Sequence, residues 1–158
     1  MISIKSHINT NSAQFKENKA AMEKLLEKLE GHLEESRFEG KDKHIDKARS
    51  RNKMLARERI EMVLDQDSPF LELLPLAGMK RKGGFGAGGT NVSGIGIVSG
   101  KLCMINSNVG TRKGGSVDYA TVFKGLRIGD ITRENKLPTI NLVESGGANL
   151  PDQAKIFN

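Results

Sequence analysis

The stretch from residue 144 to residue 149 (ESGGAN) offers chemistry from the backbone rather than from side chains. It follows residues 138–143, a β-branched run that predicts a buried strand. Gly146 and Gly147 allow a sharp turn after this strand, whose N–H groups can point together at an anion. Asn149 is a candidate cap for a following helix, with its positive dipole end at the same place. The pattern predicts an oxyanion hole, and a strand-to-helix turn without a ligand is the alternative.

A second glycine loop, residues 108–116 (NVGTRKGGS), carries two cations. Arg112 and Lys113 stand directly before Gly114 and Gly115, an arrangement that suits a phosphate or a nucleotide tail. A solvated loop is the alternative interpretation. These four residues are the candidate cofactor-binding residues.

The remaining chemical candidates are weak. Residues 84–89 fit G-x-G-x-x-G, but no strand pattern precedes them and no helix pattern follows them, so a mobile loop is the better interpretation. His7, His32 and His44 all lie in the front part of the chain, away in sequence from the glycine loops. Cys103 sits in an apolar run, where an inert buried thiol is common. Any chemistry should therefore come from backbone N–H groups, and no metal site is expected.

Composition excludes several classes of protein. The 158 residues are 37% hydrophobic and 28% charged, which is typical of neither a disordered chain nor a membrane protein. Aromatic residues make up 4%, which argues against a base-stacking surface for nucleic acid. A single cysteine and no signal-peptide pattern predict a cytoplasmic protein. The net charge is +6, and residues 41–59 alone carry eight Lys or Arg against three Asp or Glu. A solvated helix face is the simplest explanation of that run.

Periodicity predicts the elements that would position these loops. An amphipathic arm and a second helix come first, followed by a hairpin through Ser99 and Gly100, a third helix and the strand before the glycine turn. The third helix should carry Tyr119, Val122, Phe123, Leu126 and Ile131 roughly on one face. A layered α/β fold is expected. The chain resembles the front part of something larger. The predicted helices cover residues 12–39, 45–64 and 118–135, and the predicted strands cover residues 70–74, 91–98, 101–106 and 138–143.

Several blocks of the sequence, in this order, resemble the carboxyltransferase β subunits of biotin-dependent acyl-CoA carboxylases, in particular the methylcrotonyl-CoA and geranyl-CoA carboxylase type. The blocks are spread along the chain, and the resemblance covers all of it but only the N-terminal part of the family's subunit. They are RNKMLARERI (51–60), LDQDSPFLEL (64–73), GIGIVSG (94–100), KGG (113–115), ENKLP (134–138) and LVESGGA (142–148).

The resemblance implies a crotonase-like fold of β-β-α units, with residues 1–64 as a helical arm and residues 65–158 as the incomplete first part of the acyl-CoA-binding domain. It implies transfer of carboxylate from carboxybiotin to an acyl-CoA such as methylcrotonyl-CoA, with biotin supplying the base. Gly147 and Ala148 would donate N–H groups to the thioester enolate, and Gly146 would shape the turn. Biotin would be carried by a biotin carboxylase or carrier partner, and β subunits would form homo-oligomers.

Two other functions stay open. The basic helix favours a non-catalytic binding or assembly module. A crotonase-fold acyl-CoA hydratase or isomerase is the other alternative, although the turn lacks a carboxylate suited to acid–base catalysis. Neither nucleic acid nor a membrane is an expected partner.

Overall fold

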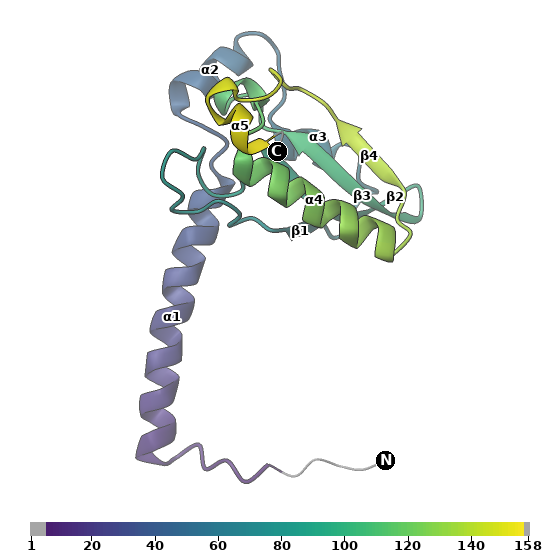
Figure 1. Cartoon of the computed structure of the whole chain (residues 1–158). Helices are drawn as coiled ribbons and strands as arrows, with labels where there is room; N and C mark the ends of the chain where they lie inside the picture. The colour runs from purple at the N-terminus through teal and green to yellow at the C-terminus, as the bar shows by residue number, and fades with distance from the viewer. Residues whose placement is uncertain (1–5, 157–158) are drawn as a thin grey trace.

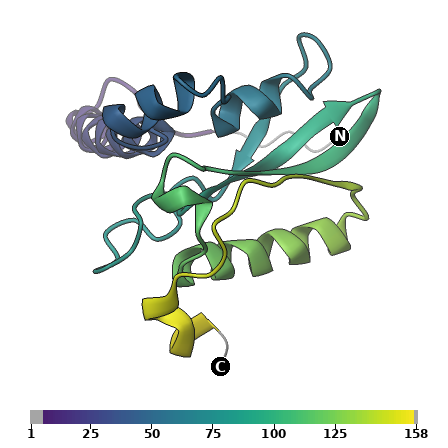
Figure 2. The same ribbon diagram turned by 90° about the horizontal axis from the view of Figure 1, so that it is seen from above.

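The computed structural model describes residues 6–156 of the chain. Within these residues, a long N-terminal helix projects from a body in which a four-stranded sheet lies between two layers of helices (Figure 1, Figure 2). Short 3-10 turns occupy Lys113–Gly115 and Leu150–Asp152. The helices and strands are, in chain order, α1 (Ala13–Arg37), α2 (Asp42–Arg49), α3 (Ala56–Glu61), β1 (Leu71–Leu73), β2 (Asn91–Val98), β3 (Lys101–Asn108), α4 (Tyr119–Glu134), β4 (Thr139–Leu142) and α5 (Gln153–Ile156).

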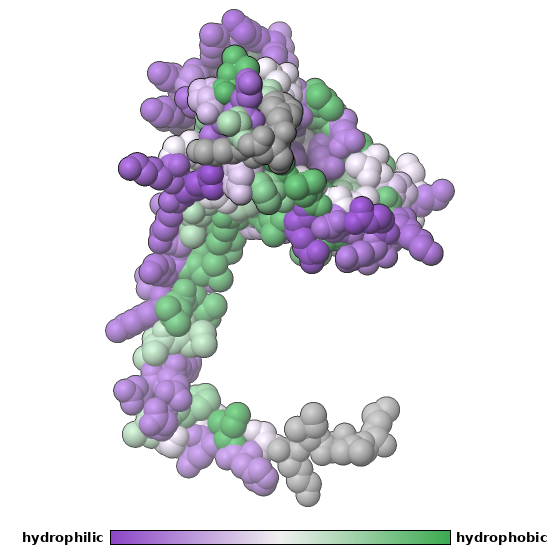
Figure 3. Space-filling view, viewed as in Figure 1, coloured by the Kyte–Doolittle hydropathy of each residue, from purple (hydrophilic) through white to green (hydrophobic). Residues whose placement is uncertain are grey.

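The arm helix α1 confirms the helix predicted over residues 12–39. It begins after Ser12, whose hydroxyl accepts a hydrogen bond from the backbone N–H of Phe15 at 3.2 Å and so caps the helix. Figure 3 shows an apolar stripe along this helix. In the part of the chain that is described, this stripe has no intramolecular cover, because four of its residues are 43–61% exposed. They are Met22, Leu25, Leu26 and Leu29.

The single helix predicted over residues 45–64 is wrong, because residues 50–55 separate α2 from α3. Asn52 has a left-handed backbone with a φ of 55°, which asparagine tolerates better than most residues. The N–H of Lys53 returns to a carbonyl in the last turn of α2 at 3.0 Å. Residues 50–55 contain neither glycine nor proline. The sequence therefore had no helix-breaking residue that would have indicated the end of α2.

Glu39, just after the arm, fixes the start of α3. Its side chain is only 4% exposed and accepts the N–H groups of Ala56 at 2.6 Å and of Arg57 at 2.9 Å. The first N–H groups of a helix have no partner inside the helix, so this carboxylate satisfies two of them. The inner face of α3 then packs on the sheet. The main core there consists of Ala56, Ile60, Val92, Cys103, Ile105 and Val109, and includes the buried thiol that the sequence predicted.

The sheet has the order β1-β2-β3-β4, with antiparallel β1–β2 and β2–β3 pairs and a parallel β3–β4 pair. The predicted hairpin is confirmed, and Ser99 and Gly100 form its turn with φ values of 51° and 74°. The Asp65 carboxylate accepts the N–H groups of both residues, at 2.6 and 2.7 Å. β4 confirms the strand predicted before the glycine turn and places the parallel pair's carboxyl ends beside one another.

Helix α4 confirms the helix predicted over residues 118–135. The apolar residues predicted to share one face are not its buried side, since Phe123 is 50% exposed and Leu126 is 61% exposed. The structure beneath α4 is polar. The Thr121 hydroxyl oxygen accepts the N–H of Thr90, and the Lys124 ammonium donates to backbone carbonyls. The helix therefore buries two polar residues that satisfy polar groups, Thr121 and Lys124, beside two apolar ones. The buried residues of α4 are Ala120, Thr121, Lys124 and Ile128.

Lys124 is a buried cation, with 2% of the residue exposed. Its Nζ donates to the carbonyl oxygens of Asn91 at 2.6 Å and of Gly88 at 3.3 Å. Burial lowers the pKa of Lys124 to about 8, partly opposed by the attraction of Glu72. The side chain thus holds the glycine-rich loop against α4 at the cost of desolvating an ammonium group.

Stability should rise with pH through Lys124. Between pH 8 and the ordinary lysine pKa of 10.5, the Lys124 amine is protonated in the unfolded chain and largely neutral in the folded chain. At about 1.4 kcal/mol per pKa unit, the free energy of unfolding of the wild type should rise by roughly 2 kcal/mol relative to that of Lys124→Met between pH 8 and pH 10. Urea unfolding of both chains at the two pH values measures this difference. Parallel pH profiles would contradict the assignment.

The order β2-β3-α4-β4 makes one β-β-α unit and the first strand of the next, which confirms the predicted α/β class. Division of the chain at residue 64 stays a prediction. Among the described residues, 6–156, none of the helices combines the length and the apolar character needed to span a membrane.

Candidate functional site

The glycine turn after β4 has a defined backbone. Gly147 takes a φ of 93°, a left-handed conformation that favours glycine. Val117 holds the turn by donating its N–H to Gly147 O and accepting the N–H of Asn149, both at 2.8 Å. The N–H of Gly147 donates to Ser145 Oγ at 3.1 Å. Within residues 6–156, the N–H of Ala148 has no hydrogen-bond partner, so a donor for an anion is available in this turn.

The two predicted glycine loops lie against each other. The N–H of Gly146 donates to Gly114 O at 2.8 Å, and Ser145 Oγ donates to Gly115 O at 3.0 Å. A Cβ on Gly115 would overlap the carbonyl oxygen of Glu144, so this approach requires glycine. The candidate cofactor loop and the candidate oxyanion turn therefore form one junction.

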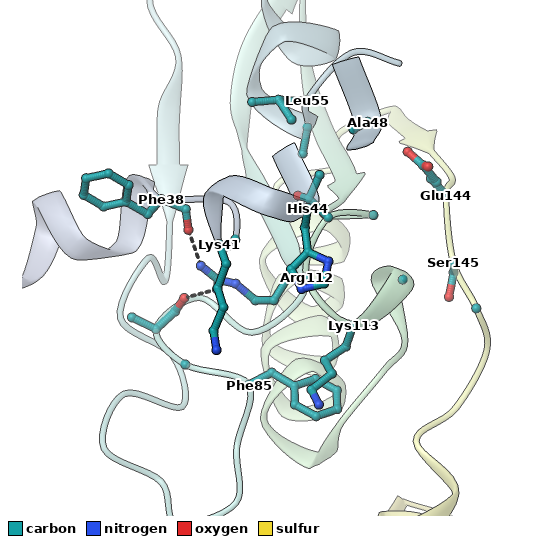
Figure 4. A pocket seen from close by; sticks show the side chains of 18 of the residues that line it. Phe38, Lys41, His44, Ala48, Leu55, Phe85, Arg112, Lys113, Glu144 and Ser145 are labelled. Carbon is teal, nitrogen blue, oxygen red and sulfur yellow. Dashed lines mark hydrogen bonds between the residues drawn. The ribbon is translucent and has the colours of Figure 1, made fainter. Parts of the chain in front are cut away.

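Arg112 stands at the centre of three segments. Its Nη1 donates to the carbonyl oxygens of Ala87 and Gly89, each at 2.7 Å, and its Nη2 donates to Phe38 O (Figure 4). Burial lowers the pKa of this guanidinium, and the charge of Arg57 lowers it further. With its donors on carbonyls, Arg112 connects the end of the arm to both glycine-rich loops.

Lys113 faces outward from the same loop, with a φ of 52° followed by 64° at Gly114. Its ammonium lies 5.8 Å from the ring centroid of Phe85, at the edge of the cation–π range. Figure 4 shows the Lys113 side chain over the Phe85 ring. An exposed ammonium beside an aromatic ring is accessible to an anionic ligand.

A cleft of about 1120 Å³ runs along this junction. The ends of α1 and α2, both glycine-rich loops and the first part of the turn line it, including Glu144, Ser145 and Gly146. Gly147 and Ala148 are not among its lining residues and follow directly after them. Cations dominate, with seven Lys or Arg against two Glu. The cations are Lys41, Lys47, Arg51, Lys53, Lys80, Arg112 and Lys113, and the acids are Glu35 and Glu144.

Sequence reasoning missed how much of the cleft the front part of the chain supplies. His44 lines the cleft beside the glycine loops, although it is distant from them in sequence (Figure 4). Lys53 lies there too, and its Nζ is 2.5 Å from the Glu144 carboxylate. The basic run at residues 41–59 was the available signal. His32 lines the cleft as well, 3.5 Å from Glu35, whereas His7 is exposed outside it.

Asn149 was predicted as a helix cap, but its side chain makes no capping bond to the helix backbone. Its Nδ2 instead donates to the Asp152 carboxylate at 3.0 Å, and the 3-10 turn at Leu150–Asp152 precedes the four-residue α5. The predicted side-chain cap at Asn149 is therefore absent. Among the described residues, no cluster of three or more His, Cys, Asp or Glu side chains could hold a metal ion.

Comparison with known proteins decides the family. The model of the carboxyl transferase domain matches residues 47–158. This chain belongs to the carboxyl transferase family.

Two relatives of this carboxyl transferase chain are named as β subunits. The probable methylcrotonoyl-CoA carboxylase beta chain of Drosophila melanogaster is 46% identical over 154 residues, which are 96% of this chain and 26% of the relative. The probable biotin-dependent acyl-coenzyme A carboxylase beta2 subunit of Mycobacterium tuberculosis is 42% identical over 98% of this chain and 29% of its own length. The chain thus spans less than a third of either relative.

Solved structures agree. The geranyl-CoA carboxylase β subunit of P. aeruginosa has a TM-score of 0.74 and 36% identity, over 99% of this chain and 29% of its own. The transcarboxylase 12S subunit, solved with methylmalonyl-coenzyme A bound, has a TM-score of 0.71 and 27% identity. The match covers 85% of this chain and 27% of the transcarboxylase chain. These matches confirm the predicted family resemblance and the crotonase-like fold.

Proposed function

We propose that this chain is part of the carboxyltransferase component of a biotin-dependent acyl-CoA carboxylase. The observation that carries the proposal is the unpartnered Ala148 N–H in a left-handed glycine turn, directly beside a basic cleft. The relatives' names support methylcrotonyl-CoA as the substrate. Biotin, carried by a biotin carboxylase or carrier partner, would supply the carboxylate and take up the substrate proton.

The turn would act on the thioester. When the acyl-CoA loses its acidic proton, negative charge develops on the thioester oxygen, and a preorganised N–H group stabilises that charge without a titrating side chain. Ala148 offers such a group directly. Gly147 would offer a second one by releasing the Ser145 hydroxyl, and Gly146 keeps the turn on Gly114. The glycine turn therefore supplies the enolate site that the family's chemistry needs.

The cleft would hold the coenzyme A portion. Its phosphates are strongly anionic, and the cations of the cleft form a field of matching sign. Lys113 is exposed next to Gly114 and Gly115, so its ammonium is more accessible to a phosphate than the Arg112 guanidinium of the same loop. Arg112 would contribute mainly by holding the loop in shape.

Homo-oligomers of the β subunit, and a cytoplasmic location, belong to the same proposal. The transcarboxylase 12S subunit, which shares this fold, forms a hexamer assembly. The Drosophila and Dictyostelium relatives are named as mitochondrial, so the compartment can differ between relatives.

An assembly module is the second candidate, favoured by the exposed apolar stripe of α1. Calorimetry with methylcrotonyl-CoA separates the two functions. If the chain is part of a carboxyltransferase, it should bind methylcrotonyl-CoA saturably. The affinity should fall about three- to tenfold in Lys113→Met and should also fall with added salt, because attraction between the cleft cations and the phosphates contributes much of the binding. A complete subunit that binds no acyl-CoA would overturn the proposed function in favour of the assembly module.

A further inference from the structure

Glu144 is held at the point where β4 passes into the glycine turn. Its carboxylate is 2.5 Å from Lys53 Nζ and 3.7 Å from Arg59 Nη2, and its side chain is 31% exposed. Lys53 comes from the segment between α2 and α3, 91 residues earlier in the chain. An ion pair therefore connects the segment between α2 and α3 to the residue at the start of the glycine turn.

Arg59 fixes the backbone on either side of this contact. Its Nη1 donates to Leu142 O at 3.2 Å and its Nη2 donates to Asn108 O. These carbonyls belong to the last residues of β4 and β3. The Asn108 side chain in turn accepts the N–H of Glu144 at 3.3 Å. The strand ends leading into the turn are thus tied to α3.

Two glycines leave room for Glu144. A Cβ on Gly110 would lie 2.6 Å from the Glu144 carboxyl carbon, and a Cβ on Gly115 would overlap the Glu144 carbonyl oxygen. The side chain is therefore confined between Gly110 on one side and its two cations on the other.

We propose that Lys53 and Glu144 are positioning residues for carboxyl transfer, and this rests on the proposed function. Their ion pair sets the direction in which the chain leaves β4, and with it the direction of the Ala148 N–H. Neither side chain touches the reacting atoms. A half-exposed ion pair contributes little to stability, so its loss should shift the turn without unfolding the chain.

The test uses the complete subunit with its biotin-bearing partner. Lys53→Met and Glu144→Gln should each lower kcat by about tenfold to a hundredfold, because small misplacements of an oriented group are costly. The KM for methylcrotonyl-CoA should stay within about threefold, because the Lys53 charge is balanced by Glu144 and adds little to the net positive field of the cleft. The double variant should lose no more than the worse single variant, and Lys53→Arg should retain kcat.

Arg133→Met is the matched control. It breaks an ion pair of the same 2.5 Å length, to Asp130, on the exposed side of α4. Its kinetics should equal those of the wild type.

Amide hydrogen exchange at Gly146 and Gly147, whose N–H groups are hydrogen-bonded to Gly114 and Ser145, gives a readout independent of activity. Exchange should accelerate in Glu144→Gln and not in Arg133→Met. An unchanged kcat with unchanged exchange overturns the proposal, and so does a raised KM at unchanged kcat, which would make Lys53 a substrate ligand. If the wild type carboxylates no acyl-CoA, the proposed function fails, and the exchange measurement decides the positioning role alone.

Discussion

Gly147→Pro in the complete subunit is expected to lower kcat for carboxyl transfer by about 10²- to 10³-fold, the typical effect of removing one oxyanion donor. Proline has no N–H and fixes φ near −65°, whereas Gly147 has a φ of 93°. The substitution removes one donor and turns the next one, at Ala148, away from its place. Steady-state kinetics with methylcrotonyl-CoA measure the effect.

Gly147→Ala is the matched control for that substitution. A Cβ at this position would meet no atom within 4 Å, and alanine keeps the N–H donor. Its cost is limited to backbone strain at positive φ, so its kcat should fall much less than that of the proline variant. Equal activity of the proline variant and the wild type would remove the turn from the mechanism.

Glu39→Ala is expected to lower the free energy of unfolding by about 3 kcal/mol or more, as removal of a buried charged partner does. The substitution leaves the buried N–H of Ala56 and the N–H of Arg57 at the start of α3 without their acceptor. It also removes a carboxylate 3.5 Å from the Arg57 guanidinium, which keeps its ion pair with Glu72 and its hydrogen bonds to the carbonyls of Ser36 and Arg37. Urea unfolding of the chain measures the loss.

Glu35→Ala provides the comparison on the same arm. The Glu35 side chain is 73% exposed, and its polar contact within residues 6–156 is with the His32 ring, at 3.5 Å. Its removal should change stability by less than about 0.5 kcal/mol. If the two variants unfold alike, Glu39 does not anchor α3.

The sequence predicted the parts of the fold that depend on local pattern. Alternating strands around Ser99 and Gly100 and the apolar spacing of α1 were sufficient, because turn chemistry and periodicity act over a few residues. The break at Asn52 was not predictable in that way, since its left-handed backbone is only one of the conformations open to asparagine.

The candidate site was predicted in its pieces and not in its arrangement. The glycines at 114–115 and 146–147 were identified as turns, but their mutual contact depends on the parallel β3–β4 pair. The buried face of α4 was missed because Lys124 satisfies carbonyls of a loop more than thirty residues away. Long-range polar contacts of this kind leave no periodic trace in the sequence.

The most direct test of the proposed function is transfer of labelled carboxylate from carboxybiotin to methylcrotonyl-CoA by the complete subunit with its biotin-bearing partner. The backbone oxyanion site predicts labelled carboxylated acyl-CoA with the wild type and a loss of label transfer of at least about a hundredfold with Gly147→Pro. Absence of label from methylcrotonyl-CoA, geranyl-CoA and every other acyl-CoA tried would contradict the proposed function.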